Sequence, residues 1–418
     1  MSSLAGRWTR VVFCAAALCQ APVDPRASTD VAAMTAALSA EVEQIRRLEF
    51  LRPVPLREIG DREAREHVLA RLAKFQSGDE IAALERVYAI LGLIPADGEL
   101  LDPLLEVLGQ QAGGFYDPDS DSFYLRDDVP PTIAPVVITH ELTHALEDQH
   151  FDIDRRLVRD RGDDDRLLAH SAVHEGSAML VMTIWIERAT SRGEFDPAIA
   201  GRVSPDRVAS AAGLDTLPEV LRRQLLAPYI LGPAFIAGGR PAGMPAAVFP
   251  AESVDALYRD PPQSSEQILH PHKYWDAARR DEPREVELGR AGRALGRKWR
   301  LRHRGTLGEL TLALLAGSPP TGDDGRIEWT NDPASGWGGD AWELWHGGGS
   351  AAVLLGTRWD TVADAREFAD ALAARGGLAW RRAGDRLAIA AGAVEDRADE
   401  VLERMLAEMK TGALVPSE

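Results

Sequence analysis

The chain has 418 residues, of which 45% are hydrophobic, and this length predicts two or three domains with sizeable cores. Its 65 Asp and Glu outweigh its 47 Lys and Arg, which gives a formal net charge of −18. Such an acidic balance argues against nucleic acid or an anionic membrane as a partner.

Residues 1–26 have the order of a secretory leader, in which arginines precede the short apolar run Val11–Leu18. The run is too short to span a bilayer. We therefore expect an exported protein, although a wrongly assigned start in a cytoplasmic protein gives the same pattern. Both cysteines, Cys14 and Cys19, fall in or beside the leader, so disulfides are not expected in the mature chain. Cys19 is a candidate lipid-attachment site.

The next segments predict a scaffold followed by a hairpin. Apolar residues recur at helical spacing in 41–51, 61–75 and 79–90. Residues 113–125 predict two aromatic-rich strands joined by an acidic turn. A sheet edge can pair with an extended peptide, so Phe123–Arg126, which directly precedes the next predicted helix, is a candidate substrate-binding edge. The alternative is an ordinary covered strand.

The central motif is His-Glu-x-x-His, within an apolar run that predicts a buried helix from about Thr132. His140 and His144 are four residues apart, so both imidazoles lie on one helix face and can bind one ion, for which zinc is the natural choice. Glu141 lies about 100° round the same helix, where it can accept a proton from water without being a ligand. The alternative is a chance occurrence of a short pattern.

A second predicted helix, Arg166–Glu187, is nearly all apolar around Glu175. A carboxylate in such a helix needs a partner, and a zinc ion held by two histidines needs a third protein ligand, so Glu175 is the candidate. Gly176 and Ser177 would let the two helices approach closely. A rival metal pair is His170 and His174, also four apart, for which polar packing is the alternative.

Several further side chains are candidates for roles around the metal. Asp148, four residues after His144, could orient a ligand ring or could be a surface carboxylate. His270, Tyr229 and Tyr274 are candidates to donate a hydrogen bond to the oxyanion that develops when a carbonyl is attacked. His270 ranks first because Pro271 after it predicts a loop position. Residues 206–226 look helical, and 229–239 form an apolar segment bounded by glycines.

Residues 284–418 predict a smaller α+β domain without a motif that carries chemistry. Its tryptophans are expected to build a core rather than a ligand platform. The expected elements are helices at 306–315, 363–375 and 396–409 and strands at 341–345, 351–358, 378–382 and 386–391.

Several motifs together resemble a group of bacterial and archaeal zinc metallopeptidase-like proteins that belong with the gluzincins, whose HExxH is completed by a downstream Glu. The motifs lie at residues 114–118, 140–151, 174–178, 227–232 and 261–274, and more faintly at 336–340 and 359–365. The resemblance implies zinc at His140, His144 and Glu175, with Glu141 as base. One departure is Met179, which stands where thermolysin-like gluzincins carry an Asp, so close kinship to thermolysin is not implied.

Together these patterns predict an α+β protein, with a mainly helical zincin-like catalytic domain at 27–283 that contains a small sheet, followed by the α+β domain at 284–418. The expected function is hydrolysis of polypeptide substrates by an exported zinc metallopeptidase. Two alternatives stay open, a catalytically inactive zinc- or protein-binding module on the same scaffold and a metal-dependent hydrolase of non-peptide substrates.

Overall fold

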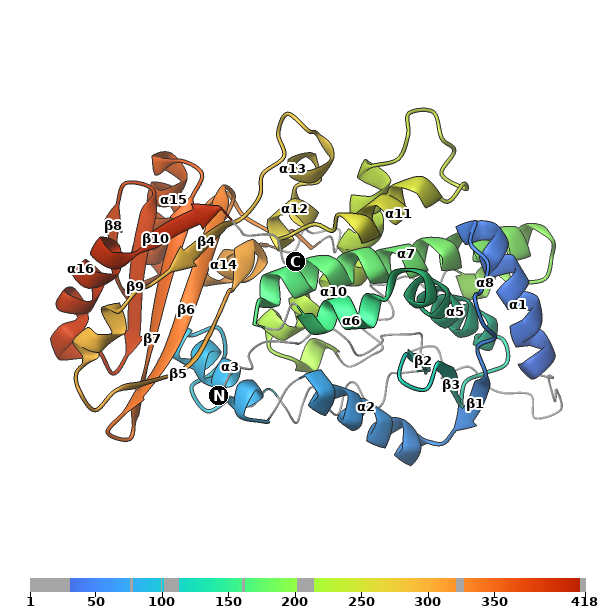
Figure 1. The fold of residues 1–418 in the computed structure, drawn as a ribbon, viewed down its shortest axis with the longest axis horizontal. Helices are drawn as coiled ribbons and strands as arrows, with labels where there is room; N and C mark the ends of the chain where they lie inside the picture. The colour runs from blue at the N-terminus through green and yellow to red at the C-terminus, as the bar shows by residue number, and fades with distance from the viewer. Residues whose placement is uncertain are drawn as a thin grey trace.

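The structure, a computed structural model, describes residues 31–75, 78–98, 100, 113–159, 162–200, 214–320 and 327–413. It has the expected α+β composition, with a helical N-terminal region and a C-terminal sheet at opposite ends of an elongated molecule (Figure 1). The expected leader, with Cys14 and Cys19, lies outside the described residues. Within them, no helix combines the length and apolarity that a bilayer crossing requires.

The helical region is built around α5, α7 and α10, which lie side by side at its centre (Figure 1). Helix α5 is apolar over most of its circumference and is buried accordingly, with α1 packed against it. Helix α7 starts at the N-cap Asp163, whose side chain accepts a hydrogen bond from the Arg166 backbone N–H. The helices are α1 (Val31–Arg46), α2 (Asp61–Phe75), α3 (Gly78–Leu91), α5 (Ala134–Phe151), α6 (Ile153–Arg159), α7 (Asp164–Ser191), α8 (Pro197–Ala200), α10 (Glu219–Gly238), α11 (Ala251–Arg259), α12 (Ser265–Leu269) and α13 (His272–Trp275).

Helix α10 differs from the sequence expectation. The expected helix at 206–226 lies partly outside the described residues, and within them α10 begins only at Glu219, after Pro218. The apolar segment 229–239 is not separate, because α10 continues through it to Gly238 despite two internal prolines. Buried contacts along α7 hold this segment helical, so tertiary packing outweighs the cost of the prolines.

A three-stranded sheet lies beside α5, in the order β1 (Leu56–Ile59), β3 (Ser122–Arg126), β2 (Gly114–Asp117). Strands β2 and β3 form the expected hairpin, and β1 pairs with β3 in parallel. The interpretation of Phe123–Arg126 as a substrate-binding edge is therefore wrong. Strand β3 is the central strand, and its backbone is paired on both sides, so the edge strands are β1 and β2.

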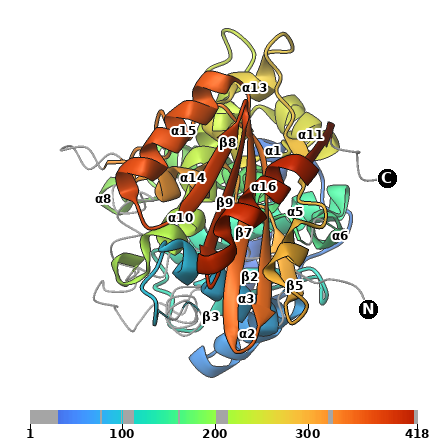
Figure 2. The ribbon, with the colours of Figure 1, turned by 90° about the vertical axis from the view of Figure 1, so that its left-hand side faces the viewer.

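The C-terminal region contains the antiparallel sheet β5–β6–β7–β9–β8 (Figures 1 and 2). One face packs against α3, α14 and α15, and the other packs against α16. The fully buried Trp337 and Trp359 belong to the core between the sheet and α3, α14 and α15, which confirms their structural role. The elements are β4 (Arg284–Glu287), β5 (Arg300–Gly305), α14 (Gly308–Ala316), β6 (Trp337–Gly347), β7 (Ser350–Trp359), α15 (Val362–Arg375), β8 (Ala379–Ala383), β9 (Arg386–Gly392), α16 (Ala398–Glu408) and β10 (Lys410–Ala413), and β10 pairs with β4.

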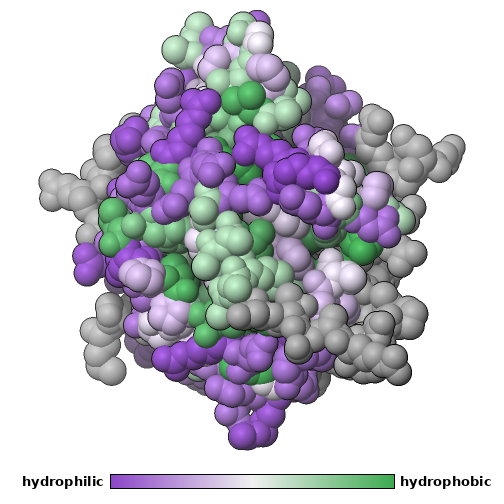
Figure 3. All heavy atoms as spheres, turned by 90° about the vertical axis from the view of Figure 1, so that its right-hand side faces the viewer, coloured by the Kyte–Doolittle hydropathy of each residue, from purple (hydrophilic) through white to green (hydrophobic). Residues whose placement is uncertain are grey.

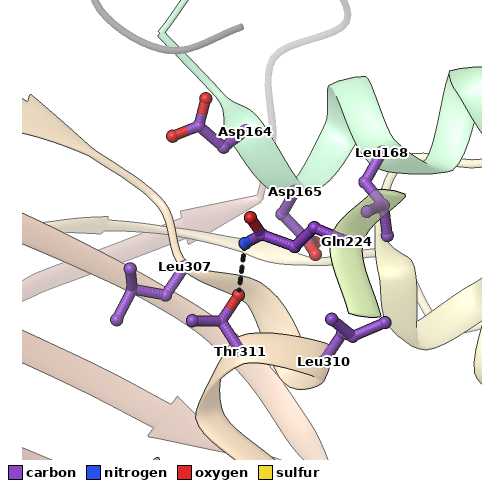
Figure 4. A pocket seen from close by; sticks show the side chains of 7 residues that line it. All are labelled: Asp164, Asp165, Leu168, Gln224, Leu307, Leu310 and Thr311. Carbon is purple, nitrogen blue, oxygen red and sulfur yellow. Dashed lines mark hydrogen bonds between the residues drawn. The ribbon is translucent and has the colours of Figure 1, made fainter. Parts of the chain in front are cut away.

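Polar contacts join the helical region to the C-terminal region. The ammonium of Lys273 lies 2.6 Å from Glu266 and 2.8 Å from Asp360, which follows β7. Gln224 of α10 donates a hydrogen bond of 3.1 Å to the Thr311 hydroxyl of α14, beside a small cavity that Asp165 at the start of α7 also lines (Figure 4). Figure 3 shows the end of the molecule that lies away from the C-terminal sheet. Its surface is mainly hydrophilic around a mildly hydrophobic centre.

Candidate metal centre

Helices α5 and α7 bring three ligand atoms together. The Nε2 atoms of His140 and His144 are 2.9 Å apart, and they lie 3.2 and 3.3 Å from Oε2 of Glu175. All three side chains are buried. The i, i+4 spacing on α5 places both imidazoles over one point, and α7 supplies the carboxylate from the facing helix. These residues form a group that can bind a metal ion.

The spacing and chemistry of these atoms fit a single ion. Three ligands at ~2.0–2.1 Å from one tetrahedral zinc ion lie about 3.3 Å from one another, close to the observed separations. The three atoms also direct their lone pairs at one point. A cation at that point can accept all three lone pairs, whereas the three atoms cannot all hydrogen-bond to one another without added protons. The Nδ1 atoms of both histidines are buried and have no hydrogen-bond partner in the described part of the chain.

Burial and mutual contact set the charge states of the group. Burial and then the neighbouring His144 lower the pKa of His140. Burial alone would raise the pKa of Glu175, but His144 and the hydrogen bonds from both histidines hold it well below its usual range. Burial alone would lower the pKa of His144, but the Glu175 carboxylate raises it and so favours a proton on His144, which a bound metal ion would displace.

Glu141 lies beside these ligands without joining them. Its Oε2 accepts a hydrogen bond of 2.9 Å from the backbone N–H of Tyr116 on β2. The Arg126 N–H bonds to the Gly113 carbonyl, and the alternation of an antiparallel pair then turns the Tyr116 N–H away from β3. The outer edge of β2 therefore orients the carboxylate of Glu141. We expected the strand at Phe123–Arg126 to form the sheet edge, but β2, its partner in the hairpin, forms the edge that faces Glu141.

Two aromatic rings border the ligands. The Tyr229 ring of α10 stacks on that of His140 with centroids 6.4 Å apart, and the His174 ring packs on that of His144 at 3.9 Å. From the sequence, His174 was expected to be a rival ligand or a polar packing residue, although its position directly before Glu175 was a signal that it borders the centre. In the described residues, neither His170 nor His174 belongs to a group of potential metal ligands.

The other two oxyanion candidates have partners elsewhere. Nε2 of His270 lies 2.9 Å from Oε1 of Glu309, on α14 at the junction with the sheet region. The hydroxyl of Tyr274 donates to the backbone carbonyl of Asp260. Of the three candidates, the structure brings Tyr229 into ring contact with a ligand.

Asp148 and Gly176 have different neighbours from those expected. Asp148 accepts the Asp154 backbone N–H where α6 begins, rather than bonding to a ligand ring. Gly176 meets α10 rather than α5, because a Cβ built on it would lie 2.5 Å from the backbone of Gly232. Ser177 does face α5, where its hydroxyl donates to the buried Glu147.

Two other sets of buried or half-buried carboxylates pair with cationic side chains instead of a metal ion. Arg46, fully buried, lies 2.5 Å from Glu147, which also accepts a hydrogen bond of 2.6 Å from the Tyr258 hydroxyl. The second group consists of Glu266, Asp281 and Asp360. Lys273 reaches all three carboxylates at 2.6–3.0 Å, so an ammonium already occupies the point on which they converge.

Comparison with known proteins gives one match. Residues 299–402 match a family model described as a domain of unknown function (DUF8575). The matched segment runs from the start of β5 into α16 and includes none of the metal centre. No curated protein and no solved structure matches the chain.

Proposed function

We propose that the protein is a zinc-dependent hydrolase that cleaves peptide bonds. The observation that carries the proposal is the convergence of His140, His144 and Glu175 with a separate, oriented carboxylate on Glu141 beside them. A purely structural zinc site is closed by four protein ligands and has no use for an adjacent base. Three ligands leave a fourth position open, which supports a catalytic role.

Zinc held by the three ligands would supply Lewis acidity to a water molecule and to the scissile carbonyl. Glu141 accepts the proton of the attacking water and passes it to the leaving amine, so its orientation by the Tyr116 N–H matters. The phenol of Tyr229, whose ring stacks on that of His140, is the favoured donor to the oxyanion.

The proposal is tested by metal analysis and peptide cleavage with the purified protein. Wild type is expected to hold one zinc ion and to cleave unfolded casein. Glu175→Ala removes a ligand and should lose the metal. Glu141→Gln keeps all three ligands and should retain the metal, while its cleavage rate falls by about 10²–10⁴-fold, since the general base is lost.

Three results separate this proposal from its alternatives. Wild-type protein without zinc, or Glu175→Ala protein with undiminished zinc, would contradict the metal centre. Zinc without cleavage of peptides or esters would favour a binding module. Cleavage of a chromogenic ester but not of casein, abolished by Glu141→Gln, would favour a non-peptide hydrolase.

A further inference from the structure

A hollow of about 510 Å³ lies at the turn between β6 and β7, beside β5 and α3. Cationic side chains from two segments line it, with Arg86 on α3, Lys298 just before β5, and Arg300 and Arg302 within β5. His346 and the turn 347–351 complete the lining. We call this site the basic hollow. Figure 1 shows the β6–β7 turn at the lower end of the sheet.

The charge of the basic hollow is opposite to that of the whole chain. Its lining has four formal cations and no carboxylate, in a protein of net charge −18. Among the described residues, none of these four cations forms an ion pair, whereas the exposed Arg381 on β8 pairs with Asp399 and Glu403. Cations held together without counter-charges repel one another, so the hollow favours a bound anion.

The local fold positions these side chains. Strand β5 pairs Leu301 with Trp345 and His303 with Leu344, so Arg302 is the extra residue of a β-bulge. Bulges redirect a side chain and recur beside functional sites. In the turn, Gly348 and Gly349 have φ angles of 62° and 83°, and a Cβ on either would meet nothing within 4 Å. The turn therefore leaves open space and exposed backbone beside the cations.

We propose that the basic hollow binds a small polyanion of the oligophosphate class. Its volume lies in the range of small-molecule sites rather than of an extended groove. Arginine presents a planar fork that matches phosphate oxygens, and a glycine turn lets backbone N–H groups approach them. The hollow includes residues of the region that matches the family model, and Arg86 completes it from the helical region. The proposal does not depend on peptidase activity.

The test is calorimetric titration of the full-length protein with inorganic pyrophosphate in 0.15 M NaCl. Wild type is expected to bind one equivalent. In Arg86→Gln/Arg302→Gln, which removes two cations from the hollow, the dissociation constant should rise at least tenfold. Ser350→Asp, which adds a carboxylate to the turn and removes no cation, should weaken binding by a similar factor.

The matched control is Arg366→Gln/Arg404→Gln, which changes the net charge equally at exposed arginines on α15 and α16. This control should bind pyrophosphate as wild type does, and thermal melting of each variant checks its fold. Absence of binding by wild type would overturn the proposal. So would equal weakening in the control, or tighter binding of a hexaglutamate peptide than of pyrophosphate.

Discussion

At the scale of single residues, the metal centre depends on side chains that different elements bring together. Tyr229 and Tyr274 are both buried tyrosines of the helical region, but they contact different groups. The ring of Tyr229 faces His140, and the hydroxyl of Tyr274 donates to the Asp260 carbonyl. The two residues therefore provide a matched pair for testing which hydroxyl acts in the reaction.

Tyr229→Phe keeps the ring and removes only the hydroxyl. If that hydroxyl donates to the oxyanion, kcat for peptide cleavage should fall by about 10²–10³-fold, with zinc content and KM little changed. Tyr274→Phe should instead cost about 1 kcal/mol of unfolding free energy, because a hydrogen bond is lost, and should leave kcat unchanged. Steady-state kinetics and urea unfolding measure both effects. An unaltered kcat in Tyr229→Phe would contradict its assigned role.

At the scale of elements, the crossing of α7 and α10 sets the site. A Cβ on Gly232 would lie 2.1 Å from the backbone oxygen of Ala172, so the two helices approach at backbone contact. Gly176, on the α7 side of this crossing, directly follows Glu175. The glycines therefore fix the distance between the helix that carries the third ligand and the helix that carries Tyr229.

Gly232→Ala should destabilise the protein by about 1–3 kcal/mol, since the added methyl group forces the helices apart. Zinc affinity should fall as well, because α7 would shift with Glu175. Gly78→Ala at the start of α3 is the control, because a Cβ there meets nothing within 4 Å and alanine favours the helix. Urea unfolding and metal analysis measure the outcome, and equal stability of Gly232→Ala and wild type would show that the crossing relaxes without cost.

At the scale of the whole molecule, buried carboxylates at the junction of the two regions make stability depend on pH. Burial raises the pKa of Asp340 to about 7, although the N–H groups of Leu307 and Gly308 lower it. Burial and then Asp163 raise the pKa of Asp165 well above its usual range. Asp164, which also lines the small cavity in Figure 4, and Glu80 are further acidic neighbours.

Because these pKa values are raised on folding, the folded state keeps protons that the unfolded chain has released above a pH of about 4. Unfolding free energy should therefore fall as the pH rises from about 4 through about 7. Asp165→Asn removes one of the titrating groups, so the loss between pH 5 and pH 8 should be smaller than in wild type. Asp399→Asn, at an exposed position, is the control. An unchanged pH dependence in Asp165→Asn, measured by urea unfolding, would contradict this account.

The sequence alone predicted the features that depend on local periodicity and spacing. These include the hairpin before α5, the helices that carry the HExxH motif and Glu175, and the alternation of strands and helices after Thr306. The i, i+4 rule was enough to place His140 and His144 on one face of a helix. Glu175 was named from the cost of an unpaired carboxylate in an apolar helix.

Tertiary structure decided which segments lie side by side. Only the sheet order shows that β3 is central and that the edge of β2 orients Glu141. Only the close crossing at Gly176 and Gly232 shows why a helix with two prolines runs beside Glu175. The basic hollow joins α3 to β5, more than 200 residues apart. No local pattern encodes these pairings, because each depends on how faces of distant elements pack against one another.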